Sequence, residues 1–210
     1  MEATERVVER TPRGQGDLLR ERLIDAALDL LDEGHEPAGI SIRGVTRRAG
    51  VSPTAFYLHF EDRPEFMWSL LERGFTEFRL KTYEGASRGS DPEERLLGAG
   101  AAYIAFAREQ PERYRLIFAA DWVEHGIEEG PDNSLEAGDA AFADLVELIA
   151  ACVGADGNPR GDLDTLALGI WSGLHGYVTL CHAHPGMAAL SDAEYTSLLA
   201  GAWLGRLSST

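Results

Sequence analysis

Residues 41–60, SIRGVTRRAGVSPTAFYLHF, constrain the fold more than any other stretch, because each junction carries a helix-start or helix-stop signal. Ser41 is a suitable N-cap for a helix over Ile42–Ala49, and Gly50 stands where a left-handed residue ends a helix without a Cβ clash. Ser52 and the proline after it favour a second helix start. Two short helices joined by a tight turn predict a helix-turn-helix, whose second helix enters the DNA major groove.

The same stretch carries no acidic residue, although the chain as a whole has a net charge of −16. Between residues 37 and 60 the only formal charges are Arg43, Arg47 and Arg48. A polyanionic partner such as DNA requires a local surface of this kind. The three arginines are either phosphate contacts or a solvated face, and Arg43, near the start of its helix, is the one we expect to reach DNA.

The second short helix, expected over residues 53–59, is too short to be stable alone and must be held by packing. Phe56 and Phe60, four positions apart, can supply the inward face. Hydroxyl and imidazole groups elsewhere on the helix can then bond to base edges or phosphate oxygens. A surface helix of an ordinary all-α domain is the alternative. The side chains expected to face nucleic acid are Pro53, Thr54, Tyr57 and His59.

Arg63 opens the next long helix, expected over Asp62–Tyr83. A cation in the first turn of a helix is unfavourable by about 0.3–1 kcal/mol, because the helix dipole is positive there. A bound phosphate would reverse this effect, since the backbone N–H groups and the guanidinium would share one anion. Pairing of Arg63 with Glu61, Asp62 or Glu65 is the alternative.

The rest of the chain repeats apolar residues at three- and four-residue spacing, and no segment alternates with period two. The predicted fold is therefore all-α, with about nine helices: an N-terminal three-helix helix-turn-helix head on a larger helical body. Further helices are expected at 17–33, 92–109, 111–122, 134–153, 163–184 and 192–207, with a break over Gly85–Asp91. The expected divisions are a flexible N-terminal arm (1–16), a DNA-binding domain (17–66) and a ligand-binding and dimerisation domain (67–210).

The run AGVSPTAFYLHF followed by EDRPEF resembles the DNA-binding head of the TetR family of bacterial transcription regulators, over Leu18–Phe66. Three positions depart from that family. Thr46 stands where alanine is usual, Leu58 where polar or basic residues are frequent, and Arg63 where lysine is usual. The resemblance implies contacts with a palindromic operator in double-stranded DNA. These contacts would fall on Ser41, Arg43, Pro53, Thr54, Tyr57, His59 and Arg63.

The segments ERYRLIFAADW and WSGLHG are similar to the WHG-type C-terminal domain of one TetR branch. The resemblance implies a repressor that a small apolar or amphipathic effector releases from DNA. A transcriptional activator, or an interaction module of the same fold that does not bind DNA, is the alternative. Plain core packing is the alternative for every aromatic residue expected to line the effector cavity: Tyr103, Phe106, Phe118, Trp122, Phe142, Trp171 and His175.

A small head reads few base pairs, and a symmetric dimer solves this by placing two heads on a palindrome. The last two long helices are expected to form the homodimer interface, because both carry apolar stripes. Glycines 169, 173 and 176 would permit a close approach of helices. The expected interface residues are Leu166, Ile170, Leu174 and Val178 on one helix, and Tyr195, Leu198, Ala202 and Trp203 on the other.

Other classes of protein fit the sequence less well. Cys181, His182 and His184 lie close together, but no second ligand pair of a zinc site accompanies them, so we expect no metal, no cofactor and no catalytic residue. The glycines, histidines and proline of residues 165–191 argue against a membrane span despite the absence of charge. Two cysteines and no apolar leader are typical of a cytoplasmic protein.

Overall fold

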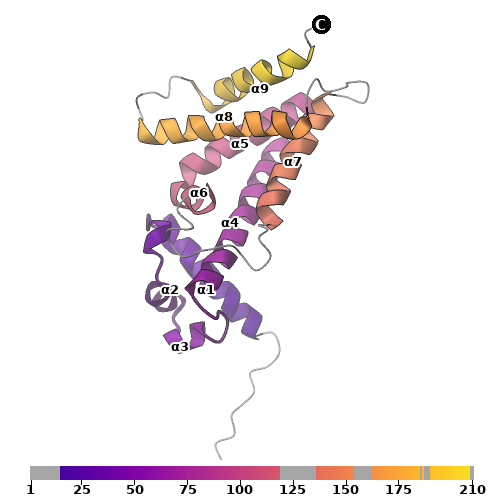
Figure 1. Cartoon of the computed structure of the whole chain (residues 1–210). Coiled ribbons are helices and arrows are strands. Elements are labelled where there is room, and N and C mark those ends of the chain that lie inside the picture. The colour runs from indigo at the N-terminus through magenta and orange to yellow at the C-terminus, as the bar shows by residue number, and fades with distance from the viewer. Residues whose placement is uncertain (1–14, 119–135, 154–161, 185, 187–189, 209–210) are drawn as a thin grey trace, which may run out of the picture.

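The computed structural model describes residues 15–118, 136–153, 162–184, 186 and 190–208. Over these residues it contains nine α-helices, one short 3-10 helix and no strand (Figure 1). The predicted all-α fold is confirmed. The elements are α1 (Gln15–Asp32), η1 (Pro37–Gly39), α2 (Ile42–Ala49), α3 (Pro53–Phe56), α4 (Arg63–Ala86), α5 (Pro92–Glu109), α6 (Pro111–Phe118), α7 (Glu136–Val153), α8 (Leu163–Ala183) and α9 (Asp192–Ser208).

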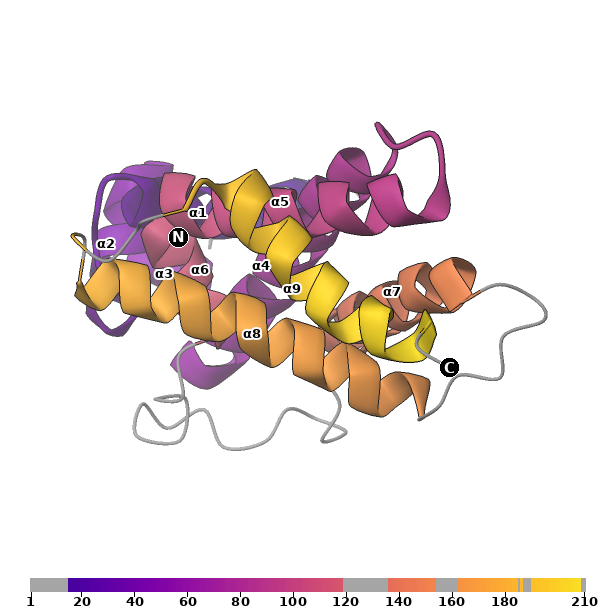
Figure 2. The ribbon, with the colours of Figure 1, turned by 90° about the horizontal axis from the view of Figure 1, so that it is seen from above.

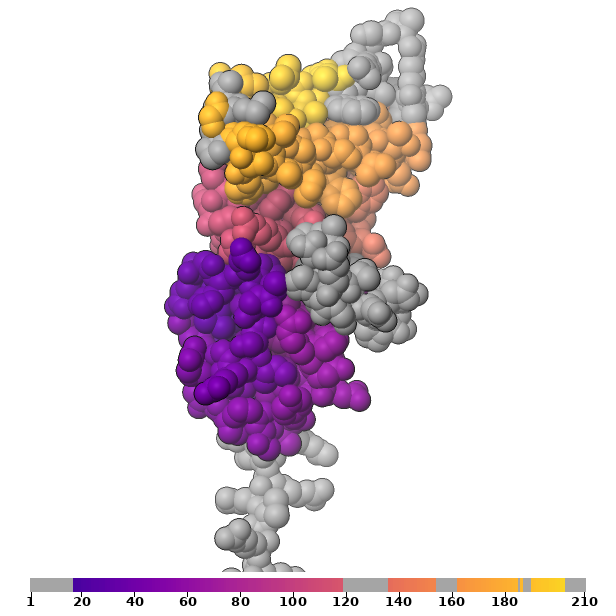
Figure 3. All heavy atoms as spheres, turned by 60° about the vertical axis from the view of Figure 1, so that its left-hand side comes forward, coloured from indigo at the N-terminus to yellow at the C-terminus, as the bar shows by residue number. Residues whose placement is uncertain are grey.

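The molecule has a small helical head at one end and a larger helical body at the other (Figure 1). Helices α1–α3 and the first turns of α4 form the head, and α4 continues from it into the body. Helices α8 and α9 cross the end of the body farthest from the head, as the view from above also shows (Figure 2). In the space-filling view the head and the body are in direct contact, with α6 lying against the head (Figure 3).

Most helix boundaries lie within a few residues of those predicted from sequence, and α2 and α5 coincide with the prediction. Helix α3 ends at Phe56 rather than near His59, and α4 extends to Ala86. The predicted end of α6 at Trp122, the predicted start of α7 at Ser134 and most of the N-terminal arm lie outside the described residues.

The predicted break over Gly85–Asp91 is confirmed from Ser87 onward, but its predicted start is wrong, because Gly85 lies inside α4 where this helix crosses α5. A Cβ atom added to Gly85 would lie 2.4 Å from the carbonyl oxygen of Gly98, and a Cβ on Gly98 would lie 2.4 Å from that of Gly85. Gly74 gives a similar close approach, since its Cβ would lie 2.8 Å from Ile117 of α6. These glycines serve helix packing rather than helix termination.

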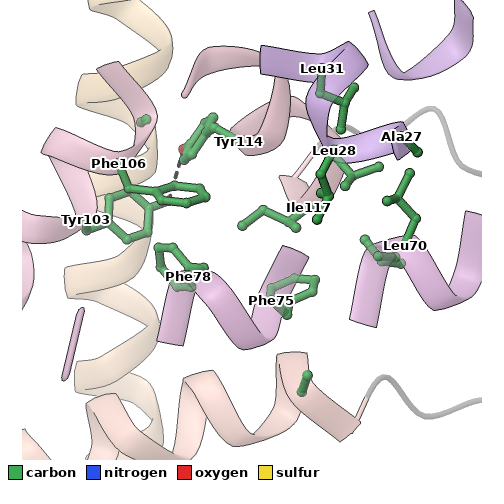
Figure 4. Close-up of a cluster of buried hydrophobic side chains, with 14 of the residues drawn as sticks. Ala27, Leu28, Leu31, Leu70, Phe75, Phe78, Tyr103, Phe106, Tyr114 and Ile117 are labelled. Carbon is green, nitrogen blue, oxygen red and sulfur yellow. Dashed lines mark hydrogen bonds between the residues drawn. The ribbon is translucent and has the colours of Figure 1, made fainter. Parts of the chain in front are cut away.

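One hydrophobic core runs through head and body without interruption. Leu28 and Leu31 of α1 face Leu70 of α4 and Ile117 of α6, and the core continues to the aromatic residues around Phe78 (Figure 4). Burial follows the apolar stripe that the sequence predicts for α1. Its buried members are Leu23, Ala26, Ala27, Leu30 and Leu31.

An ion-pair junction also ties the head to the body. The guanidinium of Arg113 on α6 contacts Asp32 of α1 at 2.6 Å and also contacts Glu77 of α4. Only 12% of the Arg113 side chain is exposed, so the pair is less screened by solvent than an ordinary surface pair. Helix α6 therefore contacts both the end of α1 and the middle of α4.

Replacing Gly85 by alanine should lower the free energy of unfolding by about 1–3 kcal/mol, because the new methyl group would overlap the backbone of α5. Urea denaturation followed by circular dichroism measures this change. Gly201→Ala is the control, since Gly201 is exposed on α9 with no atom within 4 Å of the added Cβ. An unchanged stability of Gly85→Ala, or equal losses in both variants, would show that the close crossing does not limit the fold.

Candidate nucleic-acid interface and ligand cavity

The two short helices of the head begin and end as their sequence predicts. The Ser41 hydroxyl accepts a hydrogen bond from the Gly44 N–H at 3.2 Å and caps α2. Gly50 ends that helix in the left-handed region with φ +70°, a conformation that glycine adopts without a Cβ penalty. The Ser52 hydroxyl then accepts from the Ala55 N–H at 3.2 Å and caps α3.

Helix α3 has only four residues and is held by an aromatic cluster. Phe56 and Phe60 are almost fully buried, as predicted, and both pack against Phe66 of α4. The ring centroids lie 4.9–5.2 Å apart. The guanidinium carbon of Arg20 lies 4.8 Å from the centre of the Phe60 ring and closes the cluster from the α1 side.

Packing of this cluster leaves the other face of α3 in solvent. Pro53, Thr54 and Tyr57 are exposed, and 57% of Tyr57 is accessible. His59 is half-buried in the turn that follows α3, where its N–H donates to the Phe56 carbonyl at 2.9 Å. Ser41 and Arg43 are exposed at the start of α2. The head therefore presents these groups at the end remote from α8 and α9 (Figure 1).

Arg63 makes contacts that neither sequence-based expectation includes. It is half-buried, and its Nε donates to the Ile40 carbonyl at 3.2 Å while Nη2 donates to the Ala38 carbonyl at 3.4 Å. The predicted ion pairing with its acidic neighbours is absent among the described residues. Glu65 instead accepts from the Glu61 N–H at 2.5 Å in a capping box whose cap is Asp62. Arg63 thus connects the start of α4 to the segment before α2.

The arginines of α2 divide into two kinds. Arg48 forms ion pairs with Asp29 of α1 at 3.2 Å and with Glu33, just after α1, at 2.5 Å, and hydrogen bonds to these carboxylates raise its pKa. Arg43 and Arg47 are exposed and form no ion pair with any described residue. The cations of α2 that remain available to a phosphate are therefore Arg43 and Arg47.

The acidic side chains of α1 are engaged by other arginines of the protein. Arg73 of α4 pairs with Asp25 at 3.2 Å and also with Glu21. Arg22, also on α1, donates to the Ala49 carbonyl at the end of α2 at 2.7 Å. Negative charge on the head is therefore concentrated along α1, and much of it is neutralised within the molecule.

The body encloses a cavity of about 940 Å³ between α4, α5, α7, α8 and α9. Its walls are mainly apolar and aromatic, with Phe75 and Phe78 contributed by α4. A smaller cavity of about 410 Å³ adjoins it and shares Phe118 and Trp171. The large cavity has the size and lining of a site for a small organic molecule.

The residues predicted to line a ligand site are placed in three ways. Tyr103, Phe118, Phe142 and Trp171 line the large cavity, and His175 lines the smaller one. Phe106 lines neither of these cavities, because it is buried against Phe78 with ring centroids 5.4 Å apart. Trp122 lies outside the described residues.

A polar cluster contains Tyr103, which lines the larger cavity, and His175, which lines the smaller one, together with Tyr114, which sequence analysis missed. The hydroxyl oxygen of Tyr114 lies 2.9 Å from that of Tyr103 (Figure 4) and 2.7 Å from Nδ1 of His175. Burial raises the pKa of Tyr114 to about 12 and that of Tyr103 further, and burial lowers the pKa of His175. All three groups are therefore neutral near pH 7. No motif links residues from α5, α6 and α8, so only the fold brings them together.

Comparison with known proteins connects this geometry to a family. The sequence profile described as "Tetracyclin repressor-like, C-terminal domain" matches residues 96–201, half of the chain. This chain belongs to the TetR family. The match covers α5 to α9 apart from the two ends, and hence most of the cavity wall.

Individual relatives of this TetR-family protein agree. It is 31% identical over 115 residues to the HTH-type transcriptional activator FasR of Mycolicibacterium smegmatis, covering 54% of this chain and 50% of FasR. The matched region thus spans about half the length of that curated relative. A protein of unknown function from Rhodococcus sp. RHA1 shares the fold with a TM-score of 0.73, at 26% identity over 93% of this chain and 98% of the other. A TetR family transcription regulator from Marinobacter aquaeolei VT8 has a TM-score of 0.63, at 17% identity over 91% and 96%.

The predicted dimer residues of this TetR-family protein require a correction. Leu166, Ile170, Leu174 and Val178 are buried in the core of their own chain, so this face of α8 cannot contact a second copy. The opposite face of α8 carries Leu168 and Leu180, both about half exposed.

Helix α9 is partly covered within the chain. The Tyr195 ring stacks on Tyr177 of α8 at 3.8 Å, and Gly173 approaches Leu199 rather than a second subunit. Leu198, 62% exposed, and Ala202 keep the outward position that the sequence predicts. The side chain of Trp203 lies outside the described residues.

Two other sequence-based expectations concern metals and membranes. Among the described residues no group of three His, Cys, Asp or Glu side chains is arranged to hold a metal ion. No helix in the described part combines the length and apolar character needed to span a membrane.

Proposed function

We propose that this TetR-family protein is a ligand-responsive transcriptional regulator that binds a palindromic operator as a homodimer. The observation that carries the proposal is that Arg43, Thr54 and Tyr57 are all exposed within a stretch, residues 37–60, that contains no acidic residue. Phosphate groups favour such cations, and hydroxyl groups can read base edges or bond to the backbone. The proposed divisions are an arm at 1–16, a DNA-binding domain at 17–66 and a ligand-binding and dimerisation domain at 67–210.

The proposed contacts differ in kind. Thr54 on α3 and Tyr57 at its C-cap lie on the face that would enter the major groove, with Pro53 beside them. Ser41 and Arg43 at the start of α2 would contact the phosphate backbone. His59, half-buried, would reach a phosphate from the edge of the same surface.

Arg63 receives a positioning role in this proposal. Its two hydrogen bonds hold the segment of Ala38 and Ile40, which leads directly into the cap of α2. By fixing that segment it would orient Ser41 and Arg43 toward the DNA backbone. A direct phosphate contact by Arg63 is therefore secondary in our proposal.

The cavity supports the effector-responsive part of the proposal. A ligand changes DNA affinity only if it binds one arrangement of the two heads more tightly than the other. Helix α4 is suited to link the two sites, since Phe66 packs under α3 while Phe75 and Phe78 line the cavity. Repression is the simplest outcome of operator binding, and the resemblance to FasR, named as an activator, favours activation as the second candidate.

Arg43→Ala should weaken binding to a DNA duplex that the wild-type protein selects from a random pool. The slope of the logarithm of the binding constant against the logarithm of salt concentration should also become shallower by about one unit, the equivalent of one phosphate contact. Fluorescence anisotropy over a salt series measures both quantities. The matched control is Arg88→Ala, which removes the same charge from the exposed turn after α4, far from the head. Equal losses in both variants, or no loss in Arg43→Ala, would contradict the assigned interface, and failure to enrich any duplex would contradict DNA binding.

The homodimer should depend on the exposed leucines at the far end of the body. Leu180→Glu combined with Leu198→Glu should produce a monomer in analytical ultracentrifugation, because charged groups would have to be buried in the interface. Leu80→Glu is the control, since Leu80 is 55% exposed but lies on α4. A dimer that persists in the double variant, or dissociates in the control, would place the interface elsewhere.

A further inference from the structure

The charge on the large cavity is of one sign. The charged residues among its described lining residues are Asp139, Asp144, Glu147 and Asp164, and no lysine, arginine or histidine joins them. Three of the four come from α7 and one from the start of α8. A cavity lined by one sign of charge concentrates ions of the opposite sign.

The acidic groups border the opening of the cavity. Asp139 and Glu147 are exposed along one edge of α7, and Asp164 and Leu168 are exposed on α8. Exposed lining residues of this cavity occur only on these two helices within the described part of the chain. We call Asp139, Glu147 and Asp164 the acidic rim.

The acidic rim is not neutralised by any described arginine or lysine. Arg79 of α4 engages Asp144 through two hydrogen bonds of 2.8 and 3.0 Å, so this carboxylate is already paired. Asp139, Glu147 and Asp164 form no ion pair with a described residue. Burial raises the pKa of nearby Glu72, and the negative charges of Glu136 and Asp139 raise it further, as expected where negative charge is in excess.

Behind the acidic rim the walls are mainly aromatic, and Asp144 is already paired with Arg79. Phe142 and Trp171 lie with ring centroids 6.0 Å apart, and Phe118 packs against Trp171 at 5.9 Å. His175 in the adjoining cavity is bonded to Tyr114, and burial disfavours its charged form. Aromatic faces attract cations, and this attraction is stronger where water is excluded.

We propose that the large cavity selects lipophilic cations, with an aromatic or amphipathic body and a delocalised or quaternary positive charge. The aromatic walls bind the apolar body, and the acidic rim favours a positive charge over a negative one of equal size. The inference rests on the proposed effector role of this cavity and adds the chemical class of the effector. It disfavours carboxylates and other anionic amphiphiles.

The test compares two probes of nearly equal size and opposite charge, tetraphenylphosphonium and tetraphenylborate, by isothermal titration calorimetry on the full chain. The cation should bind more tightly by on the order of tenfold. Phe142→Ala should weaken binding of the cation, since it removes an aromatic wall from the cavity. Equal affinity for the two ions, preference for the anion or no saturable binding of the cation would overturn the proposal.

Two charge-removing variants separate the rim from the general acidity of the protein. Asp139→Asn with Glu147→Gln should reduce the preference for the cation severalfold, by removing two carboxylates at the opening. Glu93→Gln with Glu109→Gln removes two exposed carboxylates of α5 that do not line the cavity, and should leave the preference unchanged. Equal effects of the two pairs would contradict a role for the acidic rim.

Operator binding distinguishes failure of this inference from failure of the proposed function. If the cation binds selectively but leaves affinity for the selected duplex unchanged, the ligand class stands and the effector-responsive proposal fails. If the chain binds the duplex but its cavity prefers the anion, the proposed role as a transcriptional regulator is retained and the inference on the ligand class fails.

Discussion

The structure of the head depends on the packing of Phe56, Phe60 and Phe66. A helix of four residues is not stable alone. The serine cap and the proline favour its first turn but do not hold it in place. The three buried rings fix its axis against α4, and that fixed axis decides which side chains remain outside. Because Phe56 is buried against α4, Thr54 and Tyr57 on the opposite side remain exposed to solvent. The proposed DNA contacts therefore follow from a packing constraint inside the head.

In both the head and the body, local ion pairs decide which charged side chains remain unpaired. In the head, arginines of α2 and α4 pair with acids of α1, so an acidic chain can present a surface with free Arg43 and Arg47 among the described residues. In the body, Arg79 pairs with Asp144 and leaves the remaining carboxylates at the cavity opening. The net charge of −16 therefore says little about either site, because each depends on which charges are paired locally.

Local signals made the head predictable, whereas contacts between distant helices did not. The caps at Ser41 and Ser52 and the left-handed Gly50 are set by neighbouring residues, so the sequence sufficed. Gly85 was wrongly predicted to begin the break after α4, because it packs against Gly98 of α5. The apolar stripe of α8 was correctly identified, but periodicity cannot tell a core from a subunit interface. Arg63 and the tyrosine–histidine cluster depend on partners more than 10 residues away, which no short motif encodes.

The central claim is that the outward face of α3 meets DNA because the aromatic cluster presents it. Amide hydrogen exchange, followed by mass spectrometry with and without the selected duplex, tests this claim most directly. The account predicts that the duplex slows exchange over residues 41–47 and 52–60 and leaves α5 and α7 unchanged. Protection confined to the body, with unaltered exchange in α3, would contradict it.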